Sequence, residues 1–426
     1  MLVFPAPEEC LKRAESMGIR EAEVYFSGAK TLSVEYMGDA CKAKEFSEDA
    51  GYGIRALKNR RVGFSHTNIP ADFTKTAKAA ATLSRISPKT DFSFEPRVRA
   101  YPSINTVDPA VAELQIEEAF SAAEEILGGI REKAEPTKVS VALSRGCESI
   151  ANSEGLYANS CYTEASIYAE AKKGTGLGFS LYSARSLPRD MRRLGQDAGR
   201  IANQMSRAKP LPTQKLTVKF SPHMLASLLG FLMFSFDGDN KRRGISKLRA
   251  GQKKFSSSLN LTSDPLADGD ASCPFDGEGV PSAPLPLVKA GKGKGFLYDR
   301  YTSALEGVTK EGSCQRTDYA SLPSPGITNL VIGPGGSKPG ETGRHLEVLS
   351  FHGLHTSDPV SGDFGVDVDI ALLHEKARTI PVTNVLLTGN IFNLFNSIKY
   401  LGKTQEVHGN LVSPEIWFSD VQIIGK

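Results

Sequence analysis

The densest group of side chains that could bind a metal ion lies between residues 351 and 370. It contains two histidines and four aspartates: His352, His355, Asp358, Asp363, Asp367 and Asp369. Imidazoles and carboxylates can together hold a transition metal. Glycines and a proline interrupt the segment, so we expect a loop, which by itself fixes no ligand geometry. Two hypotheses follow, an independent metallohydrolase that uses His352, His355 and Asp363, or a hydrogen-bonded structural loop.

Sequence motifs of several common catalytic centres are absent. A zinc peptidase of the HExxH or HExxxH type needs two histidines about one helical turn apart and a glutamate beside the first. The only His-Glu pair is His374-Glu375, and Arg378 and Thr379 stand where its second histidine would be. The chain also has no GxSxG motif, and its glycine-rich segments lack the glycines that a phosphate loop or a dinucleotide fingerprint requires. No catalytic residue is therefore assigned from motifs.

Composition narrows the class of protein further. The 426 residues are 40% hydrophobic and 23% charged, which is typical of a folded globular protein. Lysine and arginine total 51 against 48 acidic residues, and this near balance argues against a nucleic-acid partner. The longest nearly apolar run, residues 224–236, is shorter than the ~20 residues of a membrane span. The first residues, MLVFPAPEEC, do not read as a secretory signal, so we expect a cytoplasmic protein without membrane contact.

The six cysteines are widely spaced and form no CxxC pair. This spacing argues against a zinc ribbon and against a small disulfide scaffold. We therefore expect reduced thiols, mostly in the core.

The first half of the chain alternates strands with helices. Five segments alternate apolar and polar residues as strands do: EAEVYFS, TLSVEYM, KAKEF, YGIRAL and RVGFSHT. Helical periodicity or composition predicts helices near residues 8–17, 71–85, 109–127 and 189–207. Asn59-Arg60 and Asn152-Ser153-Glu154-Gly155 are predicted turns, and Gly128-Gly129 is expected to end the third helix. These elements predict an N-terminal α+β domain of antiparallel strands and helices over residues 1–209.

The second half reads as β-rich. After a strand LTVKF, Ser221 and Pro222 are a natural start for a helix over residues 222–236. Apolar residues cover nearly every face of that helix, so we expect the domain core to enclose it. Short strands and many glycine and proline turns follow. This predicts a C-terminal, mostly antiparallel, barrel-like β domain over residues 210–426 with one buried helix.

Five parts of the chain carry a family resemblance when they are read in order. They are residues 21–67 with Gly51, Gly53 and Arg55, the turn NSEG, CPFDGEGVPSAPLPLVKAGKGKGFLYDRYTSA, GLHTSDPVSGDFGVDVDIA and PVTNVLLTGN. In this order they resemble the TldD/PmbA family, long called modulators of DNA gyrase, which includes metal-dependent peptidases. The resemblance covers nearly the whole chain and implies an α+β N-terminal domain and a β-rich C-terminal domain.

The resemblance also implies a branch of that family. In its peptidase branch the helix after the domain boundary carries HExxxH, whereas here it reads HMLASLLGFLMF, with a single histidine and no glutamate. The chain therefore resembles the TldE (PmbA) branch, whose members pair with a motif-bearing TldD subunit. We expect no cofactor in this chain, zinc in the partner, and a role in processing small unfolded peptides. A homo-oligomeric peptide-binding protein without a proteolytic partner is the alternative.

Candidate positions for contact with a peptide or a partner are few. They are Arg55, Asn152, Gly155, His352, His355 and Asp363. Arg55 could equally be an ordinary exposed strand residue, and Asn152 and Gly155 could simply form a turn.

Overall fold

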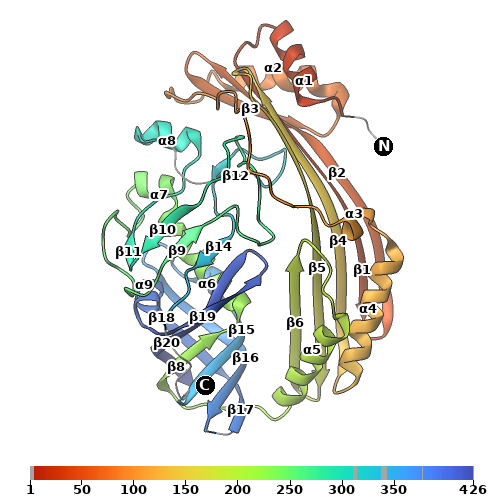
Figure 1. The fold of residues 1–426 in the computed structure, drawn as a ribbon, viewed down its shortest axis with the longest axis vertical. Coiled ribbons are helices and arrows are strands. Elements are labelled where there is room, and N and C mark those ends of the chain that lie inside the picture. The colour runs from red at the N-terminus through yellow and green to blue at the C-terminus, as the bar shows by residue number, and fades with distance from the viewer. Residues whose placement is uncertain (1–3, 310–313, 337–342, 377, 426) are drawn as a thin grey trace.

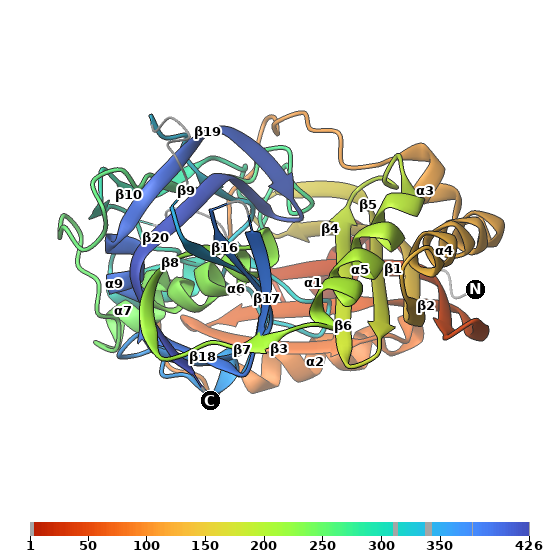
Figure 2. The ribbon, with the colours of Figure 1, turned by 90° about the horizontal axis from the view of Figure 1, so that it is seen from below.

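The computed structural model describes residues 4–309, 314–336, 343–376 and 378–425. It has an α+β fold in which a long, curved antiparallel sheet stands beside a β barrel (Figure 1). Figure 2 shows from below that the sheet with its helices and the barrel lie side by side. The predicted fold class is confirmed.

The N-terminal sheet has six antiparallel strands in the order β3-β2-β1-β4-β5-β6. Its strands are β1 Ala22–Met37, β2 Ala40–Lys58, β3 Arg61–Thr67, β4 Glu135–Asn152, β5 Tyr157–Lys173 and β6 Gly176–Ala184. The five predicted segments thus merge into three strands, because no turn separates EAEVYFS from TLSVEYM or KAKEF from YGIRAL. Asn59 and Arg60 form the predicted turn between β2 and β3, both with positive φ.

Helices cover this sheet at both ends. They are α1 Pro7–Ser16, η1 Pro70–Asp72, α2 Phe73–Leu83, α3 Pro109–Glu113, α4 Ile116–Arg131 and α5 Met191–Met205. Residues of α1 and α2 pack on Tyr52 and Ile54 of β2. Residues of α4 and α5 pack on Val34 and Val141 of β1 and β4. These helices therefore form two separate hydrophobic clusters, one at each end of the sheet.

The predicted helix over residues 109–127 is wrong in two details. Leu114 adopts a left-handed conformation with φ 52°, which splits the segment into α3 and α4. Gly128 and Gly129 lie inside α4, which continues to Arg131. A Cβ at Gly129 would lie 2.1 Å from the backbone oxygen of Arg192 in α5. This glycine therefore permits close packing of two helices and does not end one.

The expectation that all cysteines are reduced is also wrong. Cys147 of β4 and Cys161 of β5 form a disulfide, while Cys10, Cys41, Cys273 and Cys314 are free. The two strands pair so that Cys147 lies directly opposite Cys161. Spacing along the chain could not reveal this pairing, because it depends on the register between the strands.

The C-terminal part contains a closed barrel of five strands, β8, β15, β16, β18 and β20. The strands of the whole C-terminal part are β7 Lys209–Pro210, β8 Gln214–Phe220, β9 Leu261–Ser263, β10 Leu285–Lys289, β11 Lys292–Gly293, β12 Cys314–Gln315, β13 Ser324–Pro325, β14 Leu330–Ile332, β15 His345–His352, β16 Asp363–Glu375, β17 Arg378–Thr383, β18 Val385–Asn390, β19 Ile398–His408 and β20 Leu411–Gly425. Its helices are α6 Pro222–Met233, η2 Phe234–Phe236, α7 Gly238–Arg242, α8 Arg300–Glu306, η3 Leu354–Thr356 and α9 Ile391–Asn396. The β-rich, barrel-like prediction is confirmed.

Helix α6 is the predicted core helix, with a partly exposed side. Leu225, Leu228 and Leu229 are buried in the barrel core, whereas Ser227 and Gly230 are exposed. The prediction of full enclosure is therefore too strong, although the helix supplies one broad face to the core.

The chain segment that connects the two parts is short. Helix α5 ends at Met205, and Lys209 of β7 pairs with β17 of the C-terminal sheet. No helix in the described ranges is long and apolar enough to cross a membrane.

Candidate functional site

Three adjoining cavities lie between the N-terminal sheet and the barrel. Their volumes are about 610, 480 and 390 Å³, and Asp270 lines all three. Ser183 and Arg185, at and just beyond the end of β6, form part of one wall. His223 of α6 and His408 of β19 form part of the opposite wall. We call this continuous space the interdomain cleft.

His223 is fixed at the first turn of α6, where it reaches across the cleft. Ser221 stands at the N-cap position, as predicted, but its Oγ donates to the Leu349 carbonyl at 3.0 Å and not to the helix. The His223 ring donates to the backbone carbonyl of Leu181 in β6. Burial lowers the pKa of His223, so this imidazole is neutral near pH 7 and serves as a hydrogen-bond donor.

The edge of β6 that faces the cleft has no partner strand. β6 is the last strand of its sheet, and β5 is its one strand neighbour in the described ranges. In an antiparallel pair alternate residues direct their N–H and C=O groups away from the partner strand. The bond from His223 identifies Leu181 as such a residue, and Phe179 and Ser183 follow at a spacing of two. This edge can therefore pair with the main chain of an extended peptide.

Polar groups line the rest of the cleft. Ser183 Oγ donates to Asp270 Oδ2 at 2.6 Å, which joins β6 to the C-terminal part. Arg185 donates to the Ser272 carbonyl, but its Nε has no hydrogen-bond partner. Burial raises the pKa of Glu148 to about 6, and Tyr25 Oη donates to Glu148 Oε2 at 2.9 Å. The cleft thus presents both carboxylates and a guanidinium to a ligand.

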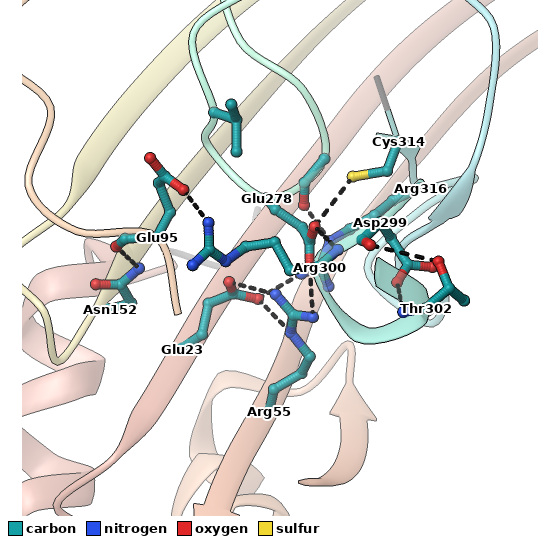
Figure 3. Close-up of polar contacts among 12 residues, drawn as sticks. Glu23, Arg55, Glu95, Asn152, Glu278, Asp299, Arg300, Thr302, Cys314 and Arg316 are labelled. Carbon is teal, nitrogen blue, oxygen red and sulfur yellow. Dashed lines mark hydrogen bonds and ion pairs between the residues drawn. The ribbon is translucent and has the colours of Figure 1, made fainter. Parts of the chain in front are cut away.

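Arg55 lies away from solvent, in a charge cluster between the sheet and the C-terminal part (Figure 3). It donates through Nε and one terminal nitrogen to both oxygens of Glu23, at 2.8 and 2.7 Å. Its other terminal nitrogen donates to Glu278 Oε1 at 2.8 Å. Arg316 is bonded to Glu23 as well. Burial lowers the pKa of Arg55, but the carboxylates of Glu23 and Glu278 outweigh it and raise the pKa above the usual arginine value.

This burial corrects the reading of Arg55 as an ordinary exposed strand residue, because its exposed fraction is 2%. The cluster extends through Glu278, whose Oε2 accepts a hydrogen bond from the backbone N–H of Arg300 at 2.7 Å. Arg300 is in turn bonded to Glu95. Arg55 therefore holds the two parts of the chain together.

Asn152 and Gly155 form the predicted turn beside Arg55. Glu23 lies opposite both Arg55 and Asn152 in the sheet register. Asn152 Oδ1 accepts from the N–H of Glu154 at 2.9 Å, while its Nδ2 donates to the Glu95 carbonyl at 2.9 Å. Gly155 has φ 80°, which favours glycine. The structure thus brings Arg55 and Asn152 together, in a role that supports the fold.

The His352 loop lies elsewhere. His352 is at the end of β15, with Nδ1 2.7 Å from Asp369 Oδ1, and it lines a separate cavity. His355 lies in η3. Asp363 begins β16, where Asn390 Nδ2 donates to it at 2.9 Å, and this bond lowers the pKa of Asp363.

A metal centre has no support in the geometry. Within the described ranges, no three His, Cys, Asp or Glu side chains are grouped so that they could hold a metal ion. His352, His355 and Asp363 are not gathered into such a group, and the hydrogen bonds of His352 and Asp363 agree with the structural-loop alternative. The residues of the cleft do not provide such a set either.

Sequence reasoning missed the cleft residues. Ser183, Arg185, His223 and Asp270 are isolated polar residues in the sequence, and no motif links them. One usable signal was the early position of His223 in a strongly apolar helix. The partners of Arg55 could not be found either, because Glu278 is 223 positions away.

Comparison with known proteins finds relatives along the whole chain. Residues 213–425, half of the 426 residues, match the model of the PmbA/TldA metallopeptidase C-terminal domain. Residues 22–84 match PmbA/TldA metallopeptidase domain 1. The protein named Metalloprotease PmbA from Escherichia coli O157:H7 is 23% identical, covering 95% of this chain and 92% of its own.

Two further proteins are similar over nearly their full length. An uncharacterized protein of Methanocaldococcus jannaschii is 26% identical, with 96% of this chain and 98% of its own covered. The crystal structure of TldE from Thermococcus kodakarensis has a TM-score of 0.87 at 21% identity, covering 98% and 99% of the two chains. This last similarity establishes a common fold.

Proposed function

Because the chain belongs to the PmbA/TldD family of metallopeptidases, we propose that it is the metal-free subunit of a two-chain metalloprotease. In this proposal a TldD-like partner subunit carries the HExxxH motif and the zinc ion. This chain holds unfolded peptides for cleavage, and it functions in the cytoplasm.

The proposal rests on which residues occupy α6 at the positions of the zinc-binding motif. A HExxxH motif beginning at His223 would need glutamate at position 224 and histidine at position 228. Met224 and Leu228 occupy these positions. Met224 Sδ accepts a hydrogen bond from the N–H of Phe351 at 3.3 Å, and Leu228 has no exposed surface. Both positions serve the packing of the barrel, which supports a zinc ion carried by a partner subunit.

The cleft supports a peptide as the ligand. The outward backbone groups of Phe179 and Ser183 and the N–H of Leu181, whose carbonyl already accepts from His223, offer the main-chain pairing by which an extended peptide adds to a sheet. Main-chain pairing is largely independent of side chains, so it suits a protein that accepts many sequences. The edge lines a cleft between the sheet and the barrel, and a single extended chain enters such a space more easily than a folded protein does, which favours unfolded peptides.

The subunit assignment is tested by purifying the native protein from its source. Metal content and peptidase activity are then measured on the complex and on the isolated chain. We expect an HExxxH-bearing partner with about one zinc per pair, and activity only when that partner is present. Stoichiometric zinc and peptidase activity in the isolated chain would overturn the proposal. Stable self-association with peptide binding but no partner would instead support the homo-oligomeric alternative.

Peptide binding at β6 is tested with a matched pair of variants. Leu181→Pro removes an outward N–H from the edge, whereas Leu181→Ala changes the side chain and keeps that N–H. We expect the proline variant to weaken the affinity for a fluorescent unstructured peptide about tenfold relative to the alanine variant. Circular dichroism checks that both variants fold. Equal affinities of the two variants would place the peptide elsewhere.

A further inference from the structure

Two segments of the C-terminal part are basic and contain no acidic residue. They are residues 240–263 and 279–298, which hold ten of the 51 lysines and arginines of the chain. The rest of the chain therefore carries 41 basic residues against 48 acidic ones. The near balance of the whole chain, from which we expected no nucleic-acid partner, averages over this uneven distribution.

Backbone pairing brings the two segments together. β10 and β11 form a hairpin, and Gly251 N–H donates to the Gly293 carbonyl of β11 at 2.9 Å. Gly293 N–H donates in turn to the Gln252 carbonyl at 3.1 Å. Figures 1 and 2 show β10 on the side of the C-terminal part that faces away from the long sheet. The two segments therefore form one surface, which lies apart from the interdomain cleft.

Three lysines of this surface stand side by side. Lys292 of β11 lies directly opposite Lys289 of β10, and on its other side it lies opposite Lys253. Residues directly opposite each other in antiparallel strands direct their side chains to the same face. All three lysines are exposed. We call Lys253, Lys289 and Lys292 the lysine row.

The charge of this surface is not neutralised within the chain. The lysine row and three further exposed residues of the same segments form what we call the basic patch: Lys247, Arg249, Lys253, Lys289, Lys292 and Lys294. In the described part of the chain, no carboxylate lies within the 4.0 Å of an ion pair from any of these six side chains. Like charges directly opposite each other destabilise paired strands, so the row lowers stability unless a bound polyanion offsets it.

We propose that the basic patch binds a nucleic-acid duplex through its phosphates, without reading the base sequence. Neighbouring strands lie about 5 Å apart, so the lysine row spans about 10 Å. Over that length each strand of a duplex presents about three phosphates. A lysine contacts a phosphate as a point charge on a flexible stem, so the row needs no exact match to the phosphate positions.

The side chains that the patch lacks favour a duplex over other polyanions. In the two segments, which are described without gaps, no aromatic or large aliphatic side chain is exposed. Protein interfaces are enriched in aromatic residues and depleted in lysine, and proteins that hold single strands stack the bases on aromatic rings. Membrane-surface segments combine their lysines with apolar side chains. Contacts to the phosphates of a duplex need none of these.

The test measures the fluorescence anisotropy of a labelled DNA duplex and of an RNA duplex with the full chain alone. We expect a dissociation constant of about 1–100 μM for both at physiological salt, with tighter binding as salt is removed. The triple variant Lys253→Gln, Lys289→Gln and Lys292→Gln is expected to bind tenfold or more weakly at low salt. Its plot of log affinity against log salt should be less steep by about 2–3, because three phosphate contacts are lost.

A matched control removes the same charge elsewhere. Lys42, Lys44 and Lys58 are exposed lysines of β2, which Figure 1 shows in the long sheet. Their triple exchange to glutamine is expected to leave affinity and salt dependence unchanged. Exchange of the lysine row to arginine keeps the charge and is expected to keep the binding. Thermal unfolding of every variant checks the fold, and loss of the row's like charges should not lower the unfolding temperature.

Several outcomes would overturn the proposal. They are no duplex binding at low salt, or equal binding by the wild type and the glutamine variant of the lysine row. Tighter binding of polyglutamate, of a single strand, or of vesicles of phosphatidylserine and phosphatidylcholine would contradict the choice of a duplex. A preference of more than about tenfold for either duplex would contradict a contact made with phosphates alone. None of these results bears on the proposed protease function, since no peptide or partner subunit is present.

Discussion

At the scale of single residues, the charge cluster around Arg55 is the most demanding feature of the molecule. Removing a guanidinium and its carboxylates from water costs several kcal/mol for each ion unless the charges pair well. Here Arg55 satisfies both oxygens of Glu23 and one of Glu278. The ring centroids of Phe92 and Phe94 lie 5.1 and 5.5 Å from its guanidinium carbon. The cluster is therefore stable only while all of its members are present.

Arg55→Ala is expected to lower the free energy of unfolding by about 3–5 kcal/mol, because it removes the cation between two buried carboxylates. Arg131→Ala is the control, since Arg131 is 46% exposed and pairs with the exposed Asp39. Its loss is expected to stay below about 1 kcal/mol. Urea denaturation measures both variants, and a similar small loss in both would show that the cluster contributes little.

Asp299 predicts a specific dependence of stability on pH. Burial, together with the nearby Glu278 carboxylate, raises the pKa of Asp299 to about 6, against about 3.9 in an unfolded chain. Between these values the folded state holds a proton that the unfolded state has released. The contribution of Asp299 to stability is therefore present below about pH 4 and is lost as pH rises to about 6.

Asp299→Asn tests this prediction, because asparagine still accepts the Thr302 N–H at the start of α8 but does not titrate. The fall in unfolding free energy between about pH 4 and 6 should be smaller in the variant by about 2–3 kcal/mol. Urea titrations at several pH values provide the comparison. Glu148 titrates equally in both proteins, so its contribution to the pH dependence cancels in the difference between their unfolding free energies. Parallel pH curves for the two proteins would refute the assignment.

At the scale of elements, period and turn residues located most helices and strands of the N-terminal half and, in the C-terminal half, the strand LTVKF and the helix that follows it. They could not give the contacts between elements. Gly128 and Gly129 look like a helix end in sequence, but Gly129 is required where α4 meets α5. The pairing of Cys147 with Cys161 likewise depends on strand register. For the site, motif order identified Arg55 and Asn152, but the cleft is built by residues from four distant segments.

The contact of α4 with α5 depends on the absence of a side chain at Gly195. A Cβ at Gly195 would lie 1.9 Å from the Ile126 backbone oxygen. Gly195→Ala is expected to destabilise the protein by about 1–3 kcal/mol, because two helix backbones must separate. Gly230→Ala, in a helix position with no atom within 4 Å, should instead stabilise it by up to about 1 kcal/mol. Thermal unfolding of the two variants should therefore shift in opposite directions, and shifts of the same sign would contradict this account.

At the scale of the whole molecule, several contacts link the two halves of the chain. Besides the Arg55 cluster, Tyr319 Oη donates to Asp49 Oδ1 at 3.0 Å, and Tyr101 Oη donates to the Gly279 carbonyl at 3.0 Å. Ser183 and Asp270 add a link across the cleft. These contacts are spread along the interface, so neither half can unfold without exposing buried polar groups of the other.

We expect the two halves to unfold in a single transition. Trp417, the only tryptophan of the chain, lies in β20 of the barrel, so its fluorescence reports on the C-terminal half. Circular dichroism reports on all helices and strands. Coincident urea transitions by the two probes are the expected result, as for one cooperative unit. A separate tryptophan transition would show that the halves are energetically independent.

The redox state of the disulfide between β4 and β5 depends on the compartment in which the chain folded. Cys147 and Cys161 are both exposed, so glutathione or thioredoxin can reach the bond. A chain kept in a reducing compartment carries both as alkylatable thiols, whereas a chain from an oxidising compartment carries neither. Alkylation of freshly lysed cells followed by mass spectrometry therefore gives the redox history of this protein from a single peptide pair.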